Sequence, residues 1–241
     1  MNELYVWFSD SHVETISIRC LFIMRLLNYT QVKYKPKYVL LPHHEKSLEK
    51  EAREIPLLKY EGEIFDKVKI IQLCKECSIL RGVPLTFEDD SLPSRILFEW
   101  STTNLLGLYV DLLYGDTKIR DKVYNDYLSI YKDLTRSDLK KVSESMLQWS
   151  IHNRDISCEV SANKELIFEI LDGLDLHLEG KTYWFGETPS ICDFSLFAFV
   201  YMLYNVQMIY FHSYILEKPN LLSWLKNMDK ISRNDFSKKR V

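Results

Sequence analysis

The most informative segment of this chain reads Gly186-Glu187-Thr188-Pro189-Ser190-Ile191-Cys192-Asp193-Phe194. The Ser190 hydroxyl can accept a hydrogen bond from the Asp193 backbone N–H, while the Asp193 carboxylate reaches back to the Ser190 N–H, so the segment predicts a capping box. The helix that begins here is apolar on nearly every side, which predicts that it is buried. Because water cannot satisfy the ends of a buried helix, a capping box is the start that such a helix requires.

Residues 1–80 are predicted to form a small mixed α/β domain. Strands are expected at residues 4–8 and 32–41, with a helix at residues 16–27 between them. The apolar stripe of that helix consists of Ile16, Cys20, Ile23 and Leu27. Residues 55–60 and 63–65 flank Glu61-Gly62, which predicts a hairpin. A second helix follows the hairpin, and its expected inward residues are Val68, Ile71, Leu73 and Cys74.

Residues 93–241 are predicted to form an all-helical domain, joined to the first by a linker at residues 81–92. Helices are expected at residues 95–113, 122–134, 138–149, 163–178 and 220–231, and no strand is expected after residue 94. Leu166, Ile170, Leu174 and Leu178 are in register on the fourth of these helices. The last carries Leu221, Trp224, Leu225 and Met228.

Two motifs in this order resemble the hallmarks of glutathione transferases. Tyr183-Trp184-Phe185-Gly186 leading into Ser190-x-x-Asp193 is similar to the box that opens their central helix. Ile55-Pro56-Leu57-Leu58 is similar to the apolar-proline pair before their third strand. The resemblance covers almost the whole chain and implies a thioredoxin-like N-terminal domain followed by an all-helical C-terminal domain. It also implies that Pro56 follows a cis peptide bond and that the Ile55 backbone pairs with the cysteinyl part of glutathione.

Within that superfamily, the pattern looks closest to the metaxin and failed-axon-connections branch. The residues that carry this likeness are the Ser190-Ile191-Cys192-Asp193 box and the segment Lys218-Pro219-Asn220-Leu221-Leu222-Ser223-Trp224. Metaxins usually act at the mitochondrial outer membrane, some through a C-terminal anchor. This sequence ends in Ser237-Lys238-Lys239-Arg240-Val241, so no such anchor is expected. The predicted location is cytoplasmic, with the mitochondrial outer surface as the alternative.

Glutathione transferases stabilise the glutathione thiolate with a hydroxyl or thiol near the start of their first helix. The resemblance therefore points to Ser9 and Ser11 as catalytic candidates, while Tyr5 lies too early in its strand. The competing interpretation, which we favour, is that residues 9–11 only cap the first helix, because such residues occur at most helix starts. No cysteine lies at this place, so disulfide-exchange chemistry is not expected.

The family also holds the γ-glutamyl end of glutathione with an acidic residue followed by serine. Here the corresponding residues are Asp66 and Lys67. Asp66 matches the acidic member, but Lys67 replaces the serine that grips the carboxylate. A lysine can pair with a carboxylate as a point charge, yet it lacks the hydrogen-bond geometry of the serine. The resemblance thus implies a glutathione site made of Ile55, Pro56, Asp66 and Lys67, in altered form.

Composition excludes several other classes of function. A net charge of -3, with acidic and basic residues nearly in balance, gives no reason to expect nucleic-acid binding. Five scattered cysteines and the lack of a secretory signal suit a reducing compartment. Cys74-Lys75-Glu76-Cys77 lies on a late helix without a second ligand pair, so no metal site is expected there or at His43-His44.

The segment 194–216 contains no Asp, Glu, Lys or Arg, and it is long enough to span a membrane. Polar residues interrupt it, so a buried helix followed by a turn is the favoured interpretation. The basic C-terminus leaves contact with a membrane surface or an acidic partner open.

Three functions remain compatible with the sequence, and no cofactor is expected beyond glutathione as a ligand or substrate. The first, which we favour, is a binding or adaptor protein with a protein partner or a second copy in a homodimer. The second is an active transferase that conjugates glutathione to small electrophiles. The third is a carrier of an apolar ligand in the cleft between the two halves.

Overall fold

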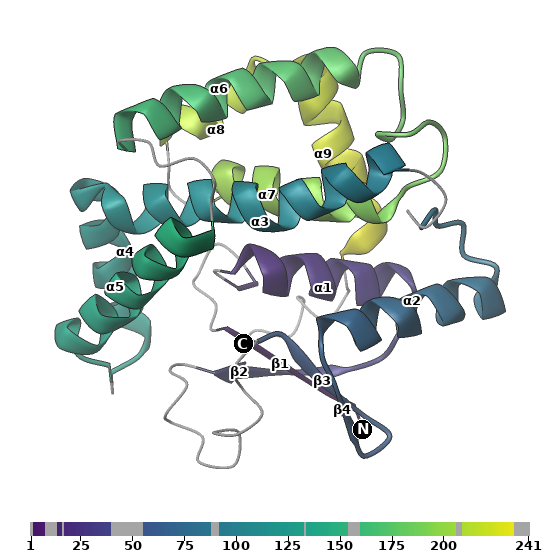
Figure 1. Cartoon of the computed structure of the whole chain (residues 1–241), viewed down its shortest axis with the longest axis horizontal. Helices are drawn as coiled ribbons and strands as arrows, with labels where there is room; N and C mark the ends of the chain where they lie inside the picture. The colour runs from purple at the N-terminus through teal and green to yellow at the C-terminus, as the bar shows by residue number, and fades with distance from the viewer. Residues whose placement is uncertain are drawn as a thin grey trace.

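The computed structural model describes residues 2–7, 14–15, 17–39, 55–87, 92–132, 134–153, 160–205 and 209–233. Its N-terminal half is a four-stranded sheet with two helices on the same side (Figure 1). The strands are β1 (Glu3–Trp7), β2 (Lys35–Val39), β3 (Leu57–Tyr60) and β4 (Glu63–Phe65), and the helices are α1 (Ile18–Tyr29) and α2 (Lys67–Arg81).

The sheet has the order β2-β1-β3-β4. β1 pairs with β2 in parallel, and β3 is antiparallel to both β1 and β4. Glu61 and Gly62 both have positive φ, 51° and 94°, which is the conformation of a two-residue hairpin turn with the twist that adjacent strands need. This strand and helix order is the predicted thioredoxin-like arrangement.

The C-terminal half consists of helices in the described residues. They are α3 (Leu92–Gly115), α4 (Thr117–Ile130), α5 (Arg136–Asn153), α6 (Val160–His177), α7 (Ile191–Asn205), α8 (Ile209–Leu216) and α9 (Pro219–Ser232). Every residue from Ile191 to Leu203 of α7 is buried, as predicted for the central helix. α7 packs against α3 and α9 of its own half and against α1 of the other half. The core therefore runs without interruption between the two halves.

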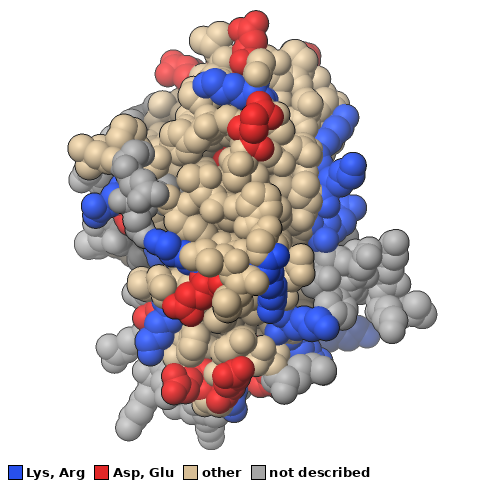
Figure 2. Space-filling model, turned by 90° about the vertical axis from the view of Figure 1, so that its right-hand side faces the viewer, with Lys and Arg blue, Asp and Glu red and all other residues tan. Residues whose placement is uncertain are grey.

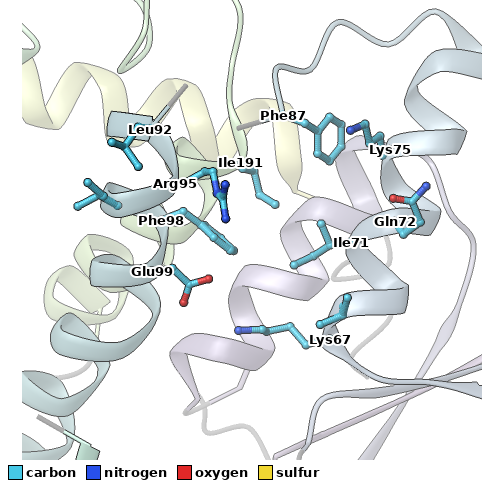
Figure 3. Close-up of a pocket in the computed structure, with 12 residues that line it drawn as sticks. Lys67, Ile71, Gln72, Lys75, Phe87, Leu92, Arg95, Phe98, Glu99 and Ile191 are labelled. Atoms are coloured by element: carbon cyan, nitrogen blue, oxygen red, sulfur yellow. The ribbon is translucent and has the colours of Figure 1, made fainter. Parts of the chain in front are cut away.

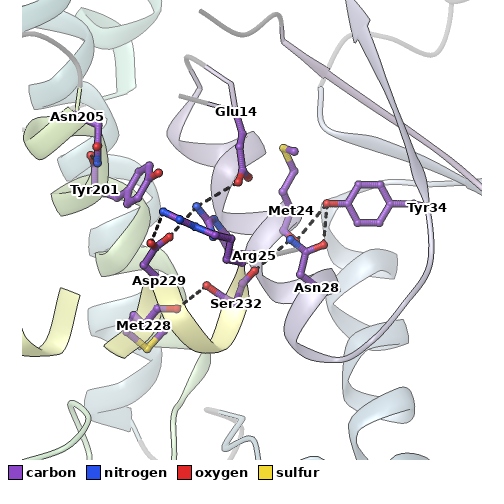
Figure 4. A network of polar contacts seen from close by, with 11 residues as sticks. Glu14, Met24, Arg25, Asn28, Tyr34, Tyr201, Asn205, Met228, Asp229 and Ser232 are labelled. Carbon is purple, nitrogen blue, oxygen red and sulfur yellow. Dashed lines mark hydrogen bonds and ion pairs between the residues drawn. The ribbon is translucent and has the colours of Figure 1, made fainter. Parts of the chain in front are cut away.

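Arg25 ties the two halves together from the middle of α1. Its side chain is fully buried, and its Nη2 lies 3.3 Å from Glu14 Oε1 and 3.1 Å from Asp229 Oδ1 on α9 (Figure 4). The guanidinium also lies over the rings of Phe197 and Tyr201 on α7, 5.4 and 5.1 Å from their centroids. Sequence reasoning missed this contact, although a single charge inside the apolar run of the first helix was a usable signal.

Several sequence predictions about the elements need correction. α1 begins at Ile18 and is capped by Ser17, whose hydroxyl accepts from the Cys20 N–H at 3.4 Å. Residues 9–11 lie six or more positions before that cap, so the interpretation that they cap the first helix is wrong. β2 is shorter than predicted in its described part, because it starts at Lys35.

The predicted faces of two helices are partly wrong. On α2, Val68 is 69% exposed, and the buried residues are Ile70, Leu73, Cys74, Cys77 and Ser78. On α6, the buried stripe is Ile167, Leu171 and Leu174, continuing to Leu178, so Leu166 and Ile170 flank it. The four apolar residues that the sequence analysis names on the last helix, which is α9, are all buried.

Within the described ranges, no single helix is long and apolar enough to cross a membrane. The pair formed by Ile191–Asn205 and Tyr210–Leu216 passes that test jointly by length and composition, but it is bent by 117°.

Candidate functional site

The first part of the candidate site is the connection between β1 and α1. Ser9 and Ser11, the predicted thiolate stabilisers, lie outside the described residues. The nearest described hydroxyls already serve the backbone: Thr15 Oγ1 donates to the Trp7 carbonyl at 2.8 Å, and Ser17 caps α1. Thr15 is also fully buried. The Thr15 hydroxyl is therefore not arranged to donate to a bound thiolate, whereas the Ser17 hydroxyl acts as an acceptor in its cap bond.

Cys20 lies on the first turn of α1, next to the end of β1. Its sulfur accepts from the Trp7 N–H at 3.5 Å, and its side chain is fully buried. Burial raises the pKa of the Cys20 thiol from 9.0 to about 11, because the thiolate loses its hydration. A buried and protonated thiol is a poor nucleophile, so Cys20 is part of the core.

The second part is the turn before β3. The Ile55–Pro56 peptide bond is cis, the form that the resemblance implies. Both residues are buried, and β3 begins directly after them, with Leu57 opposite Tyr5 of β1. The sheet thus fixes the position of the Ile55 backbone.

The third part is the N-terminus of α2. Asp66 is the N-cap, and its Oδ1 accepts from the Lys69 N–H at 2.9 Å, which satisfies one of the free donors of the first turn. Lys67 is the first residue of the helix and is half-buried. Its Nζ lies 6.0 Å from the centre of the Phe98 ring on α3. The side chain that replaces the family's serine is therefore directed toward the other half of the molecule.

A cleft of about 680 Å³ opens between α2 and α3 at this place. Figure 3 shows side chains from both helices facing each other across it. The described residues that line it are Lys67, Val68, Ile71, Gln72, Lys75, Phe87, Leu92, Arg95, Ile96, Phe98, Glu99 and Ile191. Its volume falls in the range of clefts that hold small ligands, roughly 300–1,000 Å³.

The structure brings only some of the predicted site residues into this cleft. Lys67 lines it, whereas Ile55 and Pro56 are absent from its lining. Arg95, Phe98 and Glu99 form its second wall and were missed by sequence reasoning. These three residues lie on one face of α3, at positions i, i+3 and i+4, but the sequence could not reveal that this face lies opposite α2.

A second, much smaller pocket lies between the end of β1, α3 and α5. Its volume is about 30 Å³, and the residues that line it include Trp7, Ser17, Tyr109 and Met146. It is too small for an organic ligand, because such sites occupy about 300 Å³ or more. This small pocket does not test the carrier alternative, whose ligand would lie in the cleft between the two halves.

The capping box forms a rigid support next to the cleft. Ser190 N–H donates to Asp193 Oδ2 at 2.8 Å, and Asp193 N–H donates to Ser190 Oγ at 3.3 Å. Asp193 Oδ1 accepts from the Trp184 N–H at 2.8 Å and from Trp224 Nε1 of α9 at 3.0 Å. The Asp193 carboxylate is fully buried, and its donors come from three parts of the chain. The next residue of the box, Ile191, reaches the floor of the cleft.

Among the described residues, no group of three or more His, Cys, Asp and Glu side chains is placed to hold a metal ion. Cys74 and Cys77 are both buried on α2, and burial raises the pKa of the Cys74 thiol to about 12. His43, His44 and Cys158 lie outside the described residues.

Comparison with known proteins gives the same fold. A family model for the C-terminal domain of glutathione S-transferase matches residues 159–227. A search of curated proteins returned no significant match. The solved structure of β-etherase LigF from Sphingobium sp. strain SYK-6 superposes with a TM-score of 0.62 at 14% identity, covering 95% of this chain and 94% of that one.

Two further solved structures are similar over most of this chain. A GST-like protein from Pseudomonas syringae gives a TM-score of 0.62 at 13% identity, covering 97% of this chain and 68% of that one. A glutathione transferase from Populus trichocarpa gives a TM-score of 0.59 at 14% identity, covering 99% of this chain and 97% of that one. The chain therefore has the glutathione-transferase fold, which confirms the predicted fold class.

Proposed function

We propose that this chain is a binding protein that keeps the glutathione-transferase fold but has a weakened glutathione site. The observation that supports the proposal is the position of the Lys67 side chain. Lys67 stands where the resemblance implies a serine, and its half-buried side chain lines the cleft beside Phe98. A lysine supplies charge but lacks the short hydroxyl that accepts and donates beside a helix N-terminus.

A second observation is the state of the hydroxyls near the start of α1. Thr15 donates to the Trp7 carbonyl, and Ser17 caps the helix. A transferase needs a hydroxyl or thiol that can donate to the glutathione sulfur and lower its pKa. With Thr15 engaged as a donor and Cys20 buried, that role would fall to a serine hydroxyl, that of Ser9, Ser11 or Ser17.

The finer features of the binding role remain predictions. They are the likeness to metaxins, a protein partner, dimer formation, membrane-surface contact, and a cytoplasmic or mitochondrial-surface location. A fold by itself hosts many functions, so each of these features needs its own measurement.

An active transferase is the second candidate, and two observations favour it. Ile55 and Pro56 are buried directly before β3, and Asp66 occupies the acidic position at the start of α2. In this alternative, Ser9 or Ser11 stabilises the thiolate, while Ile55, Asp66 and Lys67 hold the tripeptide. Two of the similar solved structures bear the names of a β-etherase and a glutathione transferase.

The test is calorimetric titration of glutathione into the wild-type protein and the Lys67→Ser variant. The binding proposal predicts that restoring serine strengthens glutathione binding by about tenfold, equivalent to about 1.4 kcal/mol. Lys69→Ser is the matched control, because Lys69 is an exposed cation on the same turn and does not line the cleft. Tighter binding by the wild type than by Lys67→Ser would contradict a weakened site.

A further inference from the structure

We draw no further inference here: the strongest candidate, the patch of exposed apolar side chains at the C-terminal end of α2 and the N-terminal end of α3, on the face that Figure 2 shows, carries nothing, because no feature of the described residues shows what covers it.

Discussion

At the scale of single residues, Arg25 has the largest expected effect on stability. It is a fully buried cation whose partners, Glu14 and Asp229, are only 23% and 20% exposed. Removing Arg25 takes away the ion-pair partner of Glu14, while Asp229 keeps its pair with Arg233. Breaking a buried ion pair by removing one partner costs about 3–5 kcal/mol. The expected effect on stability comes from the burial of Arg25 rather than from the number of its ion pairs.

We therefore predict that Arg25→Met lowers the free energy of unfolding by about 3–5 kcal/mol, measured by urea denaturation. The control is Arg136→Met. Arg136 is paired with Asp121 at 2.7 Å, but these side chains are 57% and 53% exposed. Exposed pairs contribute about 0–1 kcal/mol, so the control is expected to change little. Equal effects of the two substitutions would show that Arg25 has no special role in joining the halves.

At the scale of elements, two capping boxes in this chain allow a matched comparison. Ser190 and Asp193 start the buried helix α7, and Thr135 and Asp138 start α5 with the same pair of reciprocal bonds. The hydrogen bonds of the second box are exposed. Water can replace a lost partner only at the exposed box.

Asp193→Ala is predicted to destabilise the protein far more than Asp138→Ala. Each buried donor left without an acceptor costs about 1–3 kcal/mol, and Asp193 serves Trp184, Ser190 and Trp224. Loss of an exposed cap costs about 1 kcal/mol. Thermal melting and urea denaturation of both variants measure the difference. If Asp138→Ala proved as harmful as Asp193→Ala, burial of the box would not explain its effect.

The secondary-structure elements could be predicted from the sequence where a residue pattern allowed only one interpretation. The hairpin around Glu61-Gly62, the buried central helix and the four inward residues of α9 are of this kind. The inward face of α2 could not be predicted in this way, because apolar residues lie on more than one side of that helix. Tertiary packing determines which of these sides is buried. Val68 is exposed to solvent because Ile70 and Leu73 are the α2 residues that pack into the core.

The site was harder to predict than the fold for a related physical reason. Local motifs predicted the Ile55–Pro56 turn, Asp66 and Lys67 as site residues, and of these Lys67 lines the cleft. The cleft depends on how α2 and α3 pack, and Arg95 and Glu99 carry no signal for that packing. Ser9 and Ser11 remain predictions, because they lie outside the described residues.

At the scale of the whole molecule, burial of thiols makes stability depend on alkaline pH. Burial raises the pKa of Cys20 from 9.0 to about 11 and that of Cys74 from 9.0 to about 12. The folded protein thus keeps protons that the unfolded chain releases above pH 9 or so. Their contribution to stability is complete below that pH and is lost as the pH rises through the two folded-state values.

We predict that the free energy of unfolding falls as the pH is raised above 9, by at most about 1.4 kcal/mol per pH unit for each thiol. The double variant Cys20→Ala/Cys74→Ala is expected to have a shallower slope. Ser78→Ala, at a buried but non-titrating position on α2, should lower stability without changing the slope. Urea denaturation over this pH series measures all three, and an unchanged slope in the double variant would refute the assignment to these thiols.

The central claim is that this molecule retains the transferase fold for binding rather than for catalysis. The most direct measurement is the steady-state rate of glutathione conjugation to chlorodinitrobenzene at cellular glutathione concentrations. Wild type, Ser9→Ala and Ser11→Ala are compared with the uncatalysed reaction. The account predicts that all three proteins leave the background rate unchanged. A wild-type rate well above background, abolished by Ser9→Ala or Ser11→Ala, would contradict it and identify an active transferase.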